Sequence, residues 1–205
     1  MSKTGSQKRW LKEHQDDFYV KKSHQEGLRA RSAYKLIELQ EKDRLFKPGQ
    51  IVVDLGSAPG GWSQVLPRWI GSQGKIIALD LLSMDPLPQV NFLQGDFASK
   101  EVLDQLTEIL EGQTVDWVLS DMAPNFSGDK AVDQPRSMYL VELSFDFAMN
   151  YLSPGGGWLA KTFQGEGFPE LLQLARKNFK RVVTRKPEAS RDRSPECYVI
   201  GFEKK

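Results

Sequence analysis

The chain has 205 residues, of which 40% are hydrophobic and 27% are charged, and its formal net charge at pH 7 is +1. This composition is typical of a folded protein of one large domain and excludes a disordered chain, and the one cysteine, Cys197, excludes an internal disulfide. The sequence shows no apolar run long enough to cross a membrane and no apolar leader, so we expect a cytoplasmic protein without a membrane partner.

The charged residues are distributed unevenly along the chain. Residues 1–50 carry a net charge of +5, residues 51–160 of −9 and residues 161–205 of +5. Basic ends that meet on one face of a compact domain attract a polyanion, most often a nucleic acid. Solvated surface lysines and arginines give the same pattern, and charge alone does not decide between the two interpretations.

Apolar β-branched segments alternate with helical segments along the whole chain. An amphipathic stretch near residues 10–22 precedes a predicted helix over 32–42, in which Ser32 has the position of an N-cap. The predicted strands are 50–55, 74–80, 90–94, 115–120, 157–163, 181–185 and 197–202. The predicted helices among these strands are 61–70, 100–110, 138–152 and 168–178.

This alternation predicts a doubly wound α/β fold, in which helices cover both faces of a mostly parallel seven-stranded sheet. No helix separates the last two predicted strands, so we expect 181–185 and 197–202 to pair antiparallel at one edge. We interpret residues 31–205 as a single domain and residues 1–30 as a basic, partly helical extension.

The first predicted strand ends in a glycine-rich turn, DLGSAPGGWS over residues 54–63. Ligands of doubly wound sheets bind at the carboxyl ends of the strands, where Gly56 and Gly60 lack the Cβ atoms that would hold a ligand away from the backbone. The spacing is not G-x-G-x-x-G, which disfavours a dinucleotide. A turn that only joins the strand to the next helix is the alternative for this segment taken alone.

Two aspartates follow the next two predicted strands. Asp80 ends the second strand, and Asp96 follows the third. Carboxylates at this edge accept hydrogen bonds from the ribose hydroxyls of nucleoside ligands. Together with the turn, they resemble the class I S-adenosylmethionine-dependent methyltransferases, and this resemblance implies that Asp80 lies at the ribose and Asp96 at the adenine of the cofactor.

Two further motifs narrow the resemblance. The fourth predicted strand runs into SDMAPN at residues 120–125, and the fifth carries KTFQGEG at residues 161–167. The charge of Lys161 within an apolar strand is costly unless it is paired or reaches a cleft. With the glycine-rich turn, these motifs are similar to the FtsJ/RrmJ family of ribosomal RNA 2′-O-methyltransferases, over nearly the whole chain.

The resemblance implies a catalytic tetrad of two lysines and two carboxylates, which are Lys35, Asp121, Lys161 and Glu196 in this sequence. It also implies S-adenosylmethionine as the cofactor, with no metal. The residues that it places against the cofactor are Gly56, Pro59, Gly60, Trp62, Asp80, Asp96 and Asp121.

These residue types suit methyl transfer to a sugar hydroxyl, which needs an aligned and at least partly deprotonated oxygen about 3 Å from the methyl carbon. Lys161 either accepts the proton as a neutral amine or stabilises the developing alkoxide as an ammonium, and the sequence does not decide between the two roles. Asp121 and Glu196 are expected to orient the two lysines and to balance their charges.

Two other methyl acceptors fit the sequence less well. Methylation of base amino groups usually follows an Asn/Asp-Pro-Pro-aromatic turn, whereas this turn reads DMAP at residues 121–124. Methylation at pyrimidine C5 needs a cysteine nucleophile in a loop, but Cys197 lies in a predicted strand.

By the resemblance, the substrate is a uridine in the A-loop of 23S ribosomal RNA, within the large (50S) ribosomal subunit or its precursor, and we expect a monomer. Relatives that modify transfer RNA or messenger RNA caps, and a non-catalytic RNA-binding factor of the same fold, are the alternatives. The arginines expected to contact RNA are Arg29, Arg31, Arg191 and Arg193.

Overall fold

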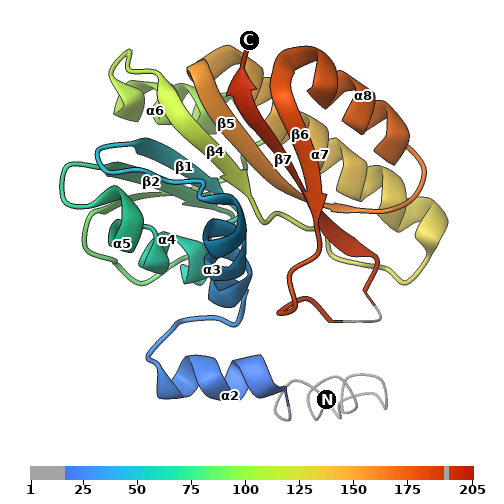
Figure 1. Cartoon of the computed structure of the whole chain (residues 1–205), viewed down its shortest axis with the longest axis horizontal. Coiled ribbons are helices and arrows are strands. Elements are labelled where there is room, and N and C mark those ends of the chain that lie inside the picture. Colours follow the sequence, from blue (N-terminus) through green and yellow to red (C-terminus); the bar gives the residue numbers. More distant parts are fainter. Residues whose placement is uncertain (1–16, 192–193) are drawn as a thin grey trace.

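The computed structural model describes residues 17–191 and 194–205. Its strands are Ile51–Leu55 (β1), Lys75–Asp80 (β2), Val90–Gln94 (β3), Val115–Ser120 (β4), Leu152–Phe163 (β5), Phe179–Arg185 (β6) and Glu196–Lys204 (β7). They form one sheet in the order β3-β2-β1-β4-β5-β7-β6 (Figure 1). Neighbouring strands from β3 to β5 are parallel, whereas β7 is antiparallel to both β5 and β6. The predicted fold class, with an antiparallel pair at one edge, is confirmed.

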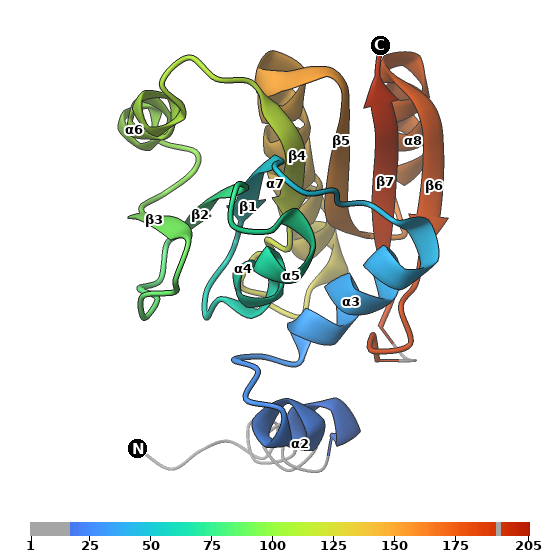
Figure 2. The ribbon, with the colours of Figure 1, turned by 60° about the vertical axis from the view of Figure 1, so that its left-hand side comes forward.

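Helices cover both faces of the sheet (Figure 2). One layer consists of α3 (Ser32–Asp43), α4 (Gly61–Val65) and α5 (Pro67–Ile70), and the other of α6 (Lys100–Leu110), α7 (Lys130–Tyr151) and α8 (Phe168–Asn178). Helix α2 (Phe18–Gln25) lies beyond the sheet, on the side where the parallel strands end (Figure 1). It overlaps the amphipathic segment predicted near 10–22, most of which lies outside the described residues. None of the helices that the structure describes is long and apolar enough to span a membrane.

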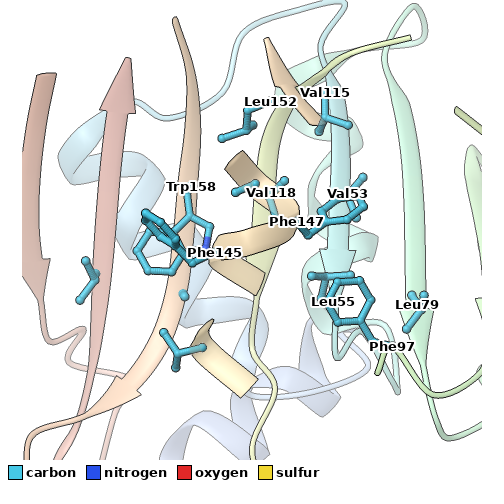
Figure 3. Packing of buried hydrophobic residues seen from close by; sticks show 14 of the residues in the cluster. Val53, Leu55, Leu79, Phe97, Val115, Val118, Phe145, Phe147, Leu152 and Trp158 are labelled. Atoms are coloured by element: carbon cyan, nitrogen blue, oxygen red, sulfur yellow. The ribbon is translucent and has the colours of Figure 1, made fainter. Parts of the chain in front are cut away.

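A core of apolar side chains lies between the sheet and helix α7 (Figure 3). Val53 on β1 and Val118 on β4 are fully buried there. The ring of Trp158 on β5 meets that of Phe145 on α7 edge to face, with 5.1 Å between the ring centroids. Full burial of such side chains contributes about 1.5–3 kcal/mol each, so this core fixes the strands that carry the candidate site at their ends.

A second core joins helices α3 and α4 to the opposite face of the sheet. Leu36 on α3 and Tyr198 on β7 are both fully buried in this core. The packing of α3 against the sheet brings Lys35 close enough to pair with Glu196 at the start of β7. This core therefore connects the first predicted catalytic lysine to the last strand.

Two helices differ from the predicted ranges. The predicted helix 61–70 is divided into α4 and α5, because Pro67 has no N–H to continue the hydrogen-bond ladder. Helix α7 begins at Lys130 rather than at 138, with Asp129 as an N-cap whose side chain accepts a hydrogen bond from the Ala131 N–H. Pro135 lies inside α7, although a proline in a helical pattern usually marks a boundary.

Candidate active site

Four of the residues predicted to contact a cofactor lie together at the carboxyl ends of β1 to β4. Gly56, Asp80, Asp96 and Asp121 line one pocket with a volume of about 370 Å³. The exposed side chains of Leu81 and Leu82 also line it. The pocket thus combines acidic groups with apolar surface, which suits a nucleoside with ribose hydroxyls and a flat base. We name it the cofactor pocket.

Gly56 allows the ends of β1 and β4 to approach each other beside this pocket. Its φ angle is +76°, and a Cβ at this position would lie 2.8 Å from the backbone nitrogen of Met122. Any other residue would push the chain after Asp121 away from the glycine-rich turn. The glycine therefore sets the distance between the turn and the aspartate that ends β4.

Asp80 is held in a fixed orientation by the backbone around it. Its Oδ2 accepts a hydrogen bond from the Ala58 N–H and its Oδ1 accepts one from the Leu82 N–H, each at 2.8 Å. Every carboxylate oxygen has a second lone pair, so both oxygens can still accept a hydrogen bond from a ligand. This arrangement fits two neighbouring hydroxyls of a ribose.

The remaining three predicted cofactor residues do not line the pocket. Pro59 is exposed, and its carbonyl accepts a hydrogen bond from Arg29 at 3.2 Å. Gly60 is buried, and Trp62 is also buried, with its indole Nε1–H donating to the Ser32 carbonyl at 2.9 Å. The side chain of Trp62 is thus used inside the fold and does not reach the pocket.

The four residues of the predicted tetrad form two ion pairs. Lys35 Nζ lies 2.5 Å from Glu196 Oε1, and Lys161 Nζ lies 3.2 Å from Asp121 Oδ1. Lys161 also donates a hydrogen bond to the Asp121 carbonyl. All four side chains are at most 17% exposed, so water screens these charges weakly.

Tyr198 connects the two ion pairs and was not predicted from the sequence. Its hydroxyl donates a hydrogen bond to Asp121 Oδ1 at 2.9 Å and lies 3.5 Å from Glu196 Oε1. Burial and the two neighbouring carboxylates raise the pKa of Tyr198 well above its usual value, so the phenol stays protonated and can donate. The one available signal was the alternation of β7, which places Tyr198 on the same face as Glu196.

A cleft of about 270 Å³ adjoins the cofactor pocket at the tetrad. Lys35, Lys161 and Glu196 line the cleft, and Ala123 lines both the cleft and the cofactor pocket. Asp121 lines the cofactor pocket, while its carboxylate pairs with Lys161 in the cleft. The amine of Lys161 therefore lies at the boundary between the two spaces. A group bound in the cleft would meet both this amine and a ligand in the pocket.

The predicted RNA-contacting arginines have different surroundings. Arg31 and Arg191 line the cleft. Arg31 is paired with Asp17 and donates to the Ala189 carbonyl. Arg29 donates to the carbonyls of residues 85 and 86 and so anchors the loop after β2. Arg193 lies outside the described residues.

Cys197 has the environment of a packed core residue. It is buried in β7, and burial raises the pKa of its thiol to about 11. At neutral pH the thiol is therefore protonated and is a weak nucleophile. This result agrees with the exclusion of methylation at pyrimidine C5.

Asp54 is a buried carboxyl beneath the site, with no role predicted from the sequence. Its Oδ2 accepts a hydrogen bond from the Ser63 hydroxyl at 2.6 Å, whereas its Oδ1 has no partner among the described residues. Burial raises the pKa of Asp54 to about 7, with smaller contributions from Asp121 and Asp80. Between about pH 4 and pH 7, the carboxyl is thus protonated in the folded state but ionised in the unfolded chain.

This raised pKa predicts a dependence of stability on pH. Because the folded-state pKa exceeds the unfolded value, the contribution of Asp54 is fully present below pH 4 and is lost as the pH rises towards and past 7. Asp54→Asn is expected to remove this loss, which amounts to up to about 4 kcal/mol in the free energy of unfolding. Denaturant titrations at pH 5 and pH 8 measure about 3 kcal/mol of this loss, with the exposed Asp104→Asn as the control. Equal pH dependence in the wild type and Asp54→Asn would contradict the assignment.

Comparisons with known proteins agree with this geometry. Residues 28–204 match the family described as FtsJ-like methyltransferase. The chain is 58% identical to ribosomal RNA large subunit methyltransferase E of Chromohalobacter salexigens, over 94% of this chain and 91% of that protein. It is 54% identical to the protein of the same name from Legionella pneumophila (strain Corby), over 98% of each chain.

A solved structure shows the same arrangement of elements. It is a crystal structure described as that of a ribosomal RNA methyltransferase from Plasmodium falciparum, with a TM-score of 0.77 and 34% identity. The match covers 86% of this chain and 98% of that chain. The resemblance that rested on three motifs is thereby confirmed, and the chain belongs to the FtsJ-like methyltransferase family.

Proposed function

We propose that the chain transfers a methyl group from S-adenosylmethionine to the ribose 2′-hydroxyl of a uridine in the A-loop of 23S ribosomal RNA, within the large ribosomal subunit. The observation that carries the proposal is the position of Asp121. This residue lines the cofactor pocket and pairs with Lys161, which lines the adjoining cleft. The relatives named as large subunit methyltransferases support ribosomal RNA as the substrate.

Different residues of the chain have separate roles in the in-line displacement. S-adenosylmethionine, when bound, supplies a methyl group on a positively charged sulfur. Asp80 and Asp96 hold its nucleoside, while Lys161 faces the 2′-oxygen in the cleft and either accepts its proton or stabilises the alkoxide. Asp121 fixes Lys161, and the Lys35–Glu196 pair supports this arrangement through Tyr198.

We further propose a cytoplasmic monomer in which residues 31–205 form the methyltransferase domain and residues 1–30 a basic extension. A direct experiment compares labelled methyl transfer to large subunits, free ribosomal RNA and transfer RNA. We expect label in the large subunit, at a nucleotide whose following phosphodiester bond resists alkaline cleavage because its 2′-hydroxyl is methylated. Label in a base, or in transfer RNA alone, would overturn the proposal.

Binding of the cofactor tests the pocket separately from catalysis. Asp80→Ala is expected to weaken binding of S-adenosylmethionine by about 1–3 kcal/mol, because two ribose hydroxyls lose a charged acceptor. Calorimetry measures this affinity, and Asp85→Ala, an exposed carboxylate on the following loop, is the matched control. Unchanged affinity in Asp80→Ala would remove this residue from the pocket, and measurable binding of NAD would contradict the choice of cofactor.

Binding of RNA is expected to fall steeply with salt, with a log–log slope of about −0.7 to −0.9 for each phosphate contacted. Arg191→Gln is expected to weaken RNA binding and to reduce the slope by the contribution of one phosphate. Arg191 lines the cleft, and its ion pair with Asp17 is long, at 3.8 Å, so its guanidinium group remains available to a phosphate. Affinity for S-adenosylmethionine is expected to stay unchanged.

The control for this prediction is Lys180→Gln, which removes an exposed cation on β6 that pairs with Glu203. Arg29 and Arg31 are less suitable for the test, because both donate hydrogen bonds to carbonyls within the fold. A slope that is unchanged in Arg191→Gln, or binding that does not depend on salt, would show that these basic side chains are only solvated surface.

A further inference from the structure

A second hollow of about 710 Å³ opens beside the cleft and has no role in the chemistry described so far. Phe126, Phe163 and Ser194 line both the hollow and the cleft, so the two spaces are continuous. Gln134 on α7 and Pro195 line the hollow but not the cleft. We call this space the base hollow.

The cleft has two chemically different sides. Its basic side chains, Arg31, Lys35, Lys161 and Arg191, do not line the base hollow, whereas Phe126 and Phe163 lie on the border with it. A ribonucleotide has the same polarity, with phosphates on one side of the ribose and the base on the other. When the 2′-oxygen lies at Lys161, phosphates fit the cationic side and the base fits the aromatic side.

Phe126 presents an aromatic ring to this space. Phe126 is 55% exposed, and its ring is held edge to face against Phe163 with 5.3 Å between centroids. Unstacked bases in RNA are recognised by stacking on such aromatic rings. Phe126 is therefore placed to stack on a base that enters from the cleft.

Gln134 offers a hydrogen-bond acceptor of fixed orientation. Its Nε2 donates to the carbonyl of Glu166 at 2.9 Å and, more weakly, to that of Phe163 at 3.4 Å. Both N–H groups are thus used, so the amide cannot reverse without placing its oxygen against two carbonyls. The Oε1 atom has no donor among the described residues.

The backbone keeps this amide in place. A Cβ at Gly165 would lie 2.8 Å from the Cδ atom of Gln134, so the amide lies directly over the glycine. An acceptor held in this way matches the N3–H of uracil. Cytosine has an acceptor at N3, and two acceptors that face each other repel.

We propose that the base hollow binds the base of the methylated nucleotide, with the ring stacked on Phe126 and the uracil N3–H donating to Gln134 Oε1. This inference rests on the proposed function, because it assumes that the 2′-oxygen lies at Lys161. It adds a residue that selects uridine over cytidine at the position of methylation.

The first test compares large subunits from cells that lack this methyltransferase, carrying either uridine or cytidine at the methylated position. Wild-type protein is expected to prefer the uridine subunit at least about tenfold in kcat/KM. Gln134→Met, which keeps the length of the side chain but has no comparable acceptor, is expected to reduce this preference to less than about threefold. An unchanged melting temperature and affinity for S-adenosylmethionine verify that the variant is folded.

The second test concerns the aromatic ring. Phe126→Ala is expected to raise KM for subunits about tenfold while turnover at saturating subunits stays within a few-fold, because stacking on the ring contributes to binding. Phe126→Tyr is expected to restore KM. The matched control is Tyr139→Ala, which removes a 52% exposed ring on α7 that does not line the hollow.

The outcomes separate this inference from the proposed function. If the wild type methylates uridine and cytidine subunits equally, or if Gln134→Met retains the full preference, the base hollow is not the site of base selection. An unchanged KM in Phe126→Ala would likewise overturn the stacking. If the wild type methylates neither subunit, the proposed function itself is wrong.

Discussion

Lys161→Ala is expected to lower the single-turnover rate of methyl transfer at least about 100-fold, which is the scale of a missing general base or oxyanion stabiliser. The amine of Lys161 lies at the boundary between the cofactor pocket and the cleft, and among residues 17–191 and 194–205 its polar contacts are both with Asp121. It acts when the 2′-oxygen loses its proton, so its removal raises the barrier without weakening the ground-state complexes.

The affinities for S-adenosylmethionine and for ribosomal subunits are therefore expected to stay within a few-fold of the wild type. Lys161→Met, which preserves the length of the side chain in this buried place, distinguishes loss of the amine from loss of packing. Lys180→Ala removes an exposed lysine and serves as the control. Methylation by Lys161→Ala at near the normal rate would disprove the role of Lys161 in the mechanism, whereas absence of methylation by the wild type would favour a factor that binds RNA without catalysis.

The residues at strand ends could be predicted because the geometry of a parallel sheet places them together. Asp80, Asp96 and Asp121 follow three strands of the same direction, so their positions in the sequence determine that they share one edge. Lys161 stood out because a charge in an apolar strand needs a partner, and the structure provides Asp121.

Other parts of the site depend on packing that the sequence does not show. Tyr198 lies in an apolar strand and is typical of a core residue until the fold brings Asp121, at the end of β4, to its hydroxyl beside Glu196 of its own strand. The orientation of the Gln134 amide depends on two carbonyls about 30 residues further along the chain, one at the end of β5 and one in the segment after it. Neither arrangement has a local pattern that a single sequence reveals.

For the basic residues too, the sequence does not show the contacts that the fold creates. A count of charges predicts that both ends of the chain are basic, but it does not show which cations are already paired. Arg31 is paired with Asp17, and Arg185 makes two hydrogen bonds with Asp43, so part of the basic surface is used to hold the fold together. The sequence did not distinguish Arg191 from these structural arginines as an RNA-binding candidate, whereas its position in the cleft does.

Asp121→Ala is expected to lower the single-turnover rate at least as much as Lys161→Ala and, in addition, to weaken binding of S-adenosylmethionine up to about tenfold. Its carboxylate lines the cofactor pocket, pairs with Lys161 and accepts the hydrogen bond of the Tyr198 hydroxyl. The substitution therefore leaves an amine and a phenol in a poorly hydrated place without their common partner.

Lys35→Ala and Glu196→Ala are the informative comparisons, because each breaks one ion pair but leaves Asp121 bonded to both Lys161 and Tyr198. Their rates are expected to fall less than that of Asp121→Ala, with unchanged affinity for S-adenosylmethionine, since neither residue lines the cofactor pocket. Single-turnover assays with saturating cofactor and subunits, together with calorimetry, separate the two effects. If Glu196→Ala proves as severe as Asp121→Ala, the Lys35–Glu196 pair takes part in the chemistry itself and does not only position the residues that perform it.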